Sequence, residues 1–112
     1  MKLSTKEAEG IVIIELQGSV LGGPDAVALN DTLHKLVEKN KKRVVLDLSG
    51  VESMNSSGLG MLIGGLTTMR NVGGDLKIAA ASKKIESLLV ITKLSTVFEL
   101  FPTIKKAISS FA

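Results

Sequence analysis

Apolar residues follow two alternating patterns along the chain. Short, continuous apolar runs rich in branched residues are typical of strands buried on both faces. Apolar residues at steps of three and four predict amphipathic helices. We expect strands at about 2–6, 11–17, 43–48, 76–80 and 97–100, and helices at about 24–40, 57–71, 83–91 and 102–111.

This order of elements predicts an α/β fold. The first two strands are separated only by Ala8-Glu9-Gly10, so we expect an antiparallel hairpin at or near a sheet edge. The later strands alternate with helices, which implies right-handed parallel crossovers. We therefore expect a mixed, mostly parallel sheet of four to five strands with about four helices. At 112 residues, the chain has room for a single domain, residues 1–112.

The expected helix at 57–71 contains more glycine than helical propensity favours. Each of its four glycines costs on the order of 1 kcal/mol relative to alanine in a helix interior. Its apolar stripe predicts the face that docks on the sheet: Leu59, Leu62, Ile63, Leu66 and Met69. The opposite face is small and uncharged: Ser57, Gly60, Met61, Gly64 and Thr68. Such a face serves either close packing of a neighbouring helix or docking of another protein, with Met61 as an adaptable apolar contact.

Asn55, Ser56 and Ser57 precede this helix, and each of them suits a helix N-cap. One cap is enough, so the other residues are candidates for another role. A phosphate on a serine here would meet free backbone N–H groups at the positive end of the helix dipole. It would also add about −1.5 to −2 charges beside an uncharged surface, which is suited to switching a protein contact off.

Composition and charge exclude several classes of function. The chain is 45% hydrophobic, has a net charge of +3, and contains neither cysteine nor tryptophan nor tyrosine. Its lysines cluster where the expected elements begin or end, without aromatic stacking platforms, so direct nucleic-acid binding is not expected. The N-terminus is too polar for a signal peptide, and no apolar stretch is long enough to span a membrane. The sequence therefore predicts a cytoplasmic protein that does not bind membranes.

Catalytic chemistry has little support. The only histidine, His34, falls toward the polar flank of the first helix. No group of residues has metal-ligand spacing, and a cysteine nucleophile is impossible. Gly58-Leu59-Gly60 resembles a phosphate-binding loop, but Ile63 stands where the dinucleotide fingerprint needs its third glycine. We expect no enzyme activity, no metal and no cofactor.

A resemblance to a known family adds to this interpretation. Met54-Asn55-Ser56-Ser57-Gly58-Leu59-Gly60 resembles the signature of the STAS domain of anti-sigma factor antagonists. The flanking segments are similar in order as well: 16–18, 44–51 and 91–98. The resemblance implies a STAS-type fold over the whole chain. It also implies that Ser56 is the phosphoacceptor, with Ser57 as second choice.

The resemblance further implies partner switching. The unphosphorylated protein would bind an anti-sigma factor that is also a serine kinase, and phosphorylation would release it. A PP2C-type phosphatase would then reset the switch. The partner-binding residues would be Asn55, Ser57, Gly58, Gly60, Met61, Gly64, Thr68 and Leu21.

Two positions depart from the family pattern. Asn55 stands where the family usually has an acid, so it keeps a capping oxygen without the negative charge. Leu21 lies where the family often has an aspartate shortly after the equivalent of Gly18, which indicates a more apolar contact or a different partner.

Other functions stay open from the sequence alone. A STAS domain can serve as a non-switching scaffold or accessory subunit in a stress-signalling or lipid-transport assembly. A nucleotide-binding domain has only the glycines in its favour. The oligomeric state does not follow from the sequence.

Overall fold

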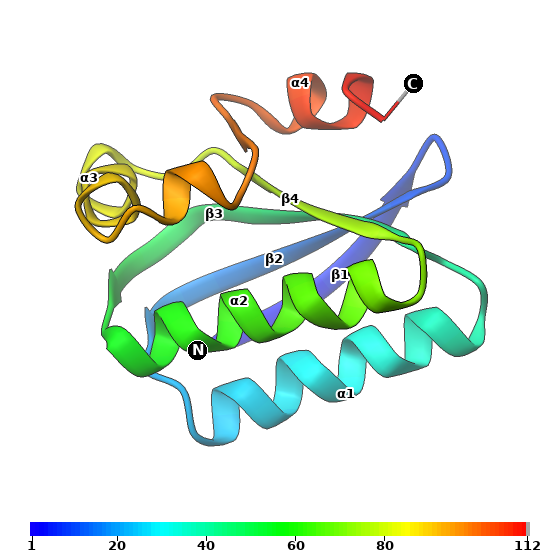
Figure 1. Ribbon diagram of the computed structural model, residues 1–112, viewed down its shortest axis with the longest axis horizontal. Helices are drawn as coiled ribbons and strands as arrows, with labels where there is room; N and C mark the ends of the chain where they lie inside the picture. The colour runs from blue at the N-terminus through cyan, green and yellow to red at the C-terminus, as the bar shows by residue number, and fades with distance from the viewer. Residues whose placement is uncertain (112) are drawn as a thin grey trace.

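The computed structural model describes residues 1–111 and contains five strands and four α-helices, with one short 3₁₀ helix (Figure 1). The strands are β1 (Lys2–Ala8), β2 (Ile11–Val20), β3 (Arg43–Met54), β4 (Asp75–Ala79) and β5 (Leu100–Phe101). The helices are α1 (Pro24–Glu38), α2 (Ser56–Asn71), α3 (Lys83–Ile91) and α4 (Ile104–Ser109), and the 3₁₀ helix η1 is Leu94–Thr96.

The strands form one mixed sheet in the order β1-β2-β3-β4-β5. β1 pairs antiparallel with β2, and every later pair is parallel. The hairpin turns at Glu9 and Gly10, whose φ angles of 56° and 77° are typical of a type I′ turn that matches the twist of the strands. The α/β class, the initial hairpin at the sheet edge and the mostly parallel sheet are thus confirmed.

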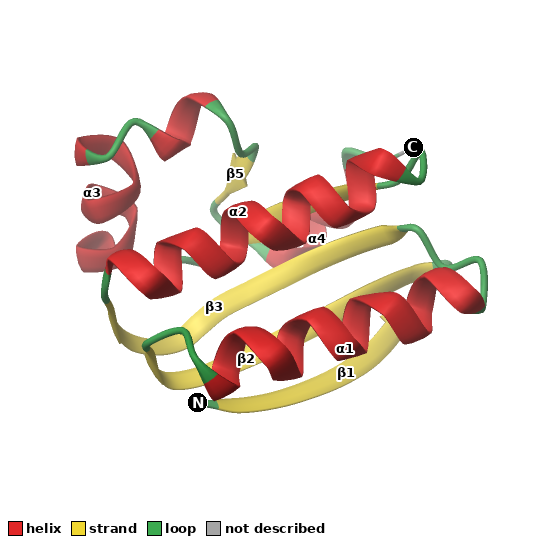
Figure 2. Ribbon diagram, turned by 60° about the horizontal axis from the view of Figure 1, so that its bottom comes forward, coloured by secondary structure: helices red, strands yellow, loops and turns green. Residues whose placement is uncertain are grey.

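The sheet is covered on both faces. α1 and α2 lie side by side on one face, α4 lies on the other, and α3 stands at one end of the molecule (Figures 1 and 2). The consecutive apolar residues of β2 divide between these layers. Val12, Ile14 and Leu16 join the core under α1 and α2, whereas Ile11 and Ile13 pack in the smaller core under α4. This arrangement explains why β2 is apolar at consecutive positions.

β3 is longer than the predicted strand at 43–48. Ser49 and Gly50 resemble a turn in the sequence, but the chain continues beside β2, with Gly18 opposite Val51 and Val20 opposite Met54. β3 carries an extra residue at two places, between Asp47 and Gly50 and between Val51 and Ser53, and these bulges absorb the mismatch in register with β2. The carboxyl end of β3 is therefore carried beyond that of β4, and α2 begins there.

The last predicted strand, at 97–100, exists, but it begins three residues later than predicted. Lys93 takes a left-handed φ of 62°, which ends α3 and starts η1. Phe98 then turns into the core instead of pairing, and the strand is only Leu100–Phe101. α4 begins at Ile104 instead of Pro102, because Thr103 caps it by accepting a hydrogen bond from the Lys106 N–H.

Candidate functional site

The segment from Asn55 to Gly58 lies where β3 passes into α2, beside the loop that joins β2 to α1 (Figure 2). The Asn55 N–H donates to the Val20 carbonyl at 3.4 Å, so the two loops are joined through their backbones. The sheet order makes this proximity necessary, because neighbouring parallel strands end at the same edge. Two segments distant in the sequence therefore form one surface.

Asn55 is the N-cap of α2. Its backbone is extended, and its Oδ1 accepts a hydrogen bond from the Gly58 N–H at 2.8 Å. The capping role expected of Asn55 is confirmed. Ser57 makes no such bond, and α2 begins at Ser56 instead of Ser57.

Ser56 is the first residue of α2, and it is exposed. The N–H groups of Ser56 and Ser57 lie in the first helical turn, where no intrahelical acceptor is available. The first turn of α2 contains no acidic residue. A negative group on the Ser56 hydroxyl would therefore meet the positive end of the helix without a competing carboxylate in that turn.

Gly58 packs inside the molecule. A Cβ at this position would lie 2.1 Å from the Val20 carbonyl oxygen, so only glycine lets α2 approach β2 this closely. Gly22, in the β2–α1 loop, must be glycine as well. Its φ is +79°, and a Cβ at this position would lie 2.6 Å from the Ser57 Cβ. The prediction that Gly58 lies on an open partner-binding face is wrong, since it is buried.

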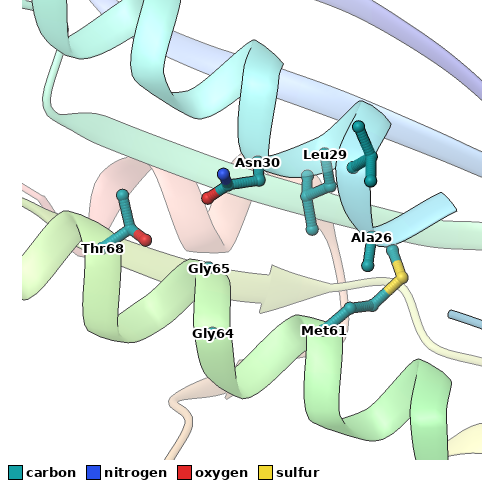
Figure 3. A pocket seen from close by; sticks show the side chains of 8 residues that line it. Ala26, Leu29, Asn30, Met61, Gly64, Gly65 and Thr68 are labelled. Carbon is teal, nitrogen blue, oxygen red and sulfur yellow. The ribbon is translucent and has the colours of Figure 1, made fainter. Parts of the chain in front are cut away.

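Met61 is also buried, with 7% of its surface exposed. It reaches from α2 toward Ala26 and Leu29 of α1, in a groove of about 390 Å³ that half-buried Thr68 also lines (Figure 3). Ile63, which the predicted stripe placed against the sheet, is 38% exposed. The predicted stripe assumes that α2 packs only on the sheet. α1 packs beside α2, which buries Met61 and turns Ile63 outward.

The remaining glycines of α2 are of two kinds. Gly65 faces α1 and the sheet, and a Cβ there would lie 3.1 Å from Leu33 Cδ1. Gly60 and Gly64 are exposed, and a Cβ at either would meet no atom within 4 Å. Packing within the described chain explains Gly65, but it does not explain Gly60 or Gly64.

We define the docking face as six exposed residues of α2 from its first turn to Thr67: Ser56, Ser57, Gly60, Ile63, Gly64 and Thr67. Arg70 and Asn71, which are also exposed, lie beyond it in the last turn. None of the six residues of the docking face is charged. Leu21 is exposed in the neighbouring loop, where its N–H donates to Asp25 Oδ2 at 3.2 Å. Of the predicted partner-binding residues, the structure thus leaves Ser57, Gly60, Gly64 and Leu21 exposed together with Asn55. Ile63 and Thr67 were missed, although their spacing from Ser56 and Gly60 could have indicated them.

The described residues also bear on metal binding, on His34 and on a membrane span. No group of three or more acidic or histidine side chains could hold a metal ion within residues 1–111. His34 is exposed, as its position on the helix predicted. Away from the site, the hydrogen bond to Glu15 raises the pKa of Lys6 on β1. None of the helices described in residues 1–111 has the length and apolar character of a membrane span.

The family model of the STAS domain matches residues 2–107. The chain belongs to the STAS domain family. BtrV of Bordetella bronchiseptica, named as an anti-sigma factor antagonist, is 28% identical over 111 residues, which are 99% of this chain and 95% of BtrV. The family assignment confirms the resemblance seen in the sequence.

Solved structures confirm the fold. The crystal structure of an anti-sigma factor antagonist from Thermotoga maritima superposes with a TM-score of 0.85 at 23% identity, covering 96% of this chain and 92% of that one. The Bacillus cell fate determinant SpoIIAA in its phosphorylated form gives a TM-score of 0.74 at 15% identity, covering 99% of this chain and 100% of SpoIIAA. At these identities the likeness speaks for the fold alone.

Proposed function

We propose that this STAS protein is an anti-sigma factor antagonist that is switched by phosphorylation at Ser56. Unphosphorylated, it binds an anti-sigma factor that is also a serine kinase; phosphorylated, it releases that partner. The observation that carries the proposal is the position of Ser56, which is exposed at the start of α2 and borders an uncharged surface. The names of the relatives, and the phosphorylated form of SpoIIAA among the structural neighbours, support it.

The helix terminus tolerates the charge that the switch requires. A phosphate on Ser56 would lie against the free N–H groups of the first turn, where a negative charge is favoured by about 0.3–1 kcal/mol. Asn55 caps the helix without a charge of its own, so it does not repel the phosphate. The fold is therefore expected to stay intact after modification, and the effect falls on the partner.

Phosphorylation weakens binding of the partner, although it leaves the fold intact. A partner surface that fits the docking face meets only neutral groups when Ser56 is unphosphorylated. Phosphorylation places about two negative charges at the edge of the docking face. The complex must then either desolvate these charges or hold the partner away from them, and both weaken binding. Release follows without a rearrangement of the sheet or the helices.

Gly60 and Gly64 support close approach of the partner. Both cost helix stability, and neither makes room for another atom of the described chain. Two glycines one turn apart let a neighbouring chain reach the backbone of α2, and Ile63 adds an apolar contact between them. Leu21 would extend this contact onto the β2–α1 loop.

Ser56 is a better acceptor than Ser57. The Ser57 Cβ lies against Gly22, so a phosphate on Ser57 would have to fit beside the β2–α1 loop. Ser56 is exposed, and none of its atoms is among the nearest to a Cβ at Gly22 or within 4 Å of one at Gly23. The same exposure would let a PP2C-type phosphatase reach the phosphoserine and reset the switch.

The test uses the cognate anti-sigma factor kinase with ATP, followed by mass spectrometry and a binding assay. We expect one phosphate on Ser56 and loss of the complex. Ser56→Ala is expected to bind constitutively, and Ser56→Asp to bind poorly if charge alone drives release. Ser57→Ala tests the choice of serine and is expected to be phosphorylated normally. Ser4→Ala, which alters an exposed serine on β1, is the matched control and is expected to bind and be released normally.

The same experiment separates the alternatives. Binding that persists with no phosphate incorporated would favour a non-switching scaffold or accessory subunit. Wild-type binding by both Ser56 variants, with and without ATP, would contradict the switch. A rise in thermal unfolding temperature with ATP in the absence of the kinase would favour a nucleotide-binding domain.

A further inference from the structure

α3 exposes an apolar pair of residues on its outer side. Val90 and Ile91 are 55% and 79% exposed, and Val97, just beyond η1, is 41% exposed. The buried side of the helix is separate and consists of Ile85 and Leu89. The exposed pair is therefore not part of the packing that holds α3 on the molecule.

The outer side of α3 is arranged as a single face. We define the α3 face as Lys83, Lys84, Glu86, Ser87, Val90 and Ile91. Steps of three, four and seven residues bring these positions to one side of a helix, with the two lysines in the first turn and the aliphatic pair in the last. A depression of about 480 Å³ on this side is lined by Lys83, Glu86, Ser87 and the aliphatic pair.

The net charge of the α3 face is positive. Lys83 and Lys84 occupy the first turn of α3, where the helix dipole disfavours a cation. None of the ion pairs within residues 1–111 involves Lys83 or Lys84. Local stability does not explain two lysines at this helix end, and they outnumber Glu86, the single acid of the face.

We propose that the α3 face is a second protein-binding surface, which takes an amphipathic helix with an apolar stripe and acidic flanks. The stripe would cover Val90 and Ile91, and the acidic flanks would pair with Lys83 and Lys84. The hollow shape favours a side-chain-bearing partner over a flat lipid surface. Such a partner could occupy the protein whatever the state of Ser56, because no residue of the docking face belongs to α3.

α3 lies apart from α1 and α2, so its outer face is separate from the groove between them. Both ribbon views show α3 at one end of the molecule, outside the layer formed by α1 and α2 (Figures 1 and 2). Its contacts are with β3 and η1 instead. A partner on the α3 face would therefore leave the groove between α1 and α2 open.

Two synthetic peptides test this inference by nuclear magnetic resonance titration of the full-length protein. One is a helical peptide with leucines at steps of three and four flanked by glutamates, and the other has lysines in place of the glutamates. We expect the acidic peptide to perturb amides of residues 83–97 saturably and the basic peptide to leave them unchanged. Raising the salt concentration is expected to weaken the acidic peptide's binding.

Variants assign the effect to the face. Val90→Ser with Ile91→Ser, and separately Lys83→Glu with Lys84→Glu, are each expected to weaken acidic-peptide binding at least about tenfold. The aliphatic side chains are exposed, so thermal unfolding should barely change in the serine variant, whereas the two glutamates in the first turn of α3 should raise the unfolding temperature rather than lower it. Val27→Ser, which alters an exposed valine on α1, is the matched control and should bind normally.

Several results would overturn the inference. These are equal binding of the basic peptide, perturbations confined to the α1–α2 groove, and no saturable shift at millimolar peptide. Sedimentation with phosphatidylglycerol vesicles that Val90→Ser with Ile91→Ser abolishes would assign the face to a membrane instead. A dimer lost in the same variant would assign it to a second copy of the chain.

Discussion

Replacing Gly60 and Gly64 by alanine is expected to stabilise the protein while weakening its complex. Both residues lie in the interior of α2, and an added Cβ meets nothing within 4 Å at either position. Each substitution should therefore gain the helix propensity of alanine, about 0.8–1 kcal/mol in the free energy of unfolding. For a chain of this size that corresponds to a rise of roughly 4 °C in Tm for each substitution.

Binding should change in the opposite direction. If a partner approaches the α2 backbone over these glycines, each new methyl group enters an already filled contact. Overpacking of this kind costs about 1–3 kcal/mol, or roughly fivefold to 150-fold in Kd. Only a surface used by another molecule predicts a gain in stability together with a loss of affinity.

The assay combines thermal or urea unfolding of each free variant with calorimetric titration of the anti-sigma factor. His34→Ala, an exposed change on α1, controls for a general effect of helix propensity on binding. Gly58→Ala is the opposite control, because its Cβ would meet the Val20 carbonyl and should destabilise the fold. Unchanged affinity in both Gly60→Ala and Gly64→Ala would refute the docking face, and lower stability would show that these glycines serve internal packing.

Two further pairs of variants test the site's architecture by urea unfolding. Asn55→Ala should lose about 0.5–2 kcal/mol of stability because the Gly58 N–H loses its cap, whereas Asn55→Asp should keep that bond; equal losses would contradict the capping role. Met61→Ala should cost about 2–5 kcal/mol since it empties the space against α1. Ile63→Ala should cost less than about 1 kcal/mol because its side chain is largely outside the core, and the reverse order would contradict the assigned face.

The local signals in this chain were strong enough to locate most elements. Branched apolar runs marked β2 and the first half of β3, Pro24 marked the start of α1, and the glycines at 73 and 74 marked the end of α2. These signals depend on dihedral preference, capping and periodicity, which act within a few residues. Where a local signal was ambiguous, as at Ser49 and Gly50, pairing with β2 determined the outcome.

The same division applies to the candidate site. The run Asn55-Ser56-Ser57 before a glycine-rich helix was sufficient to predict a cap and a candidate phosphoacceptor, because the chemistry of a helix terminus is local. The sequence did not show which side of α2 stays free. Met61 was assigned to that side, and Gly58 was named among the partner-binding residues, but the structure buries both.

The sequence by itself therefore determined the α/β class and the order of the elements. It also determined that Ser56 is a serine at a capped helix N-terminus, where a phosphate would be tolerated. The tertiary structure alone decided which residues of α2 face outward. The reason is physical: a helix that packs on both a sheet and a second helix has two contact stripes, and the angle between them depends on where α1 lies. That angle buries Met61, exposes Ile63 and leaves Gly60 and Gly64 without an internal neighbour.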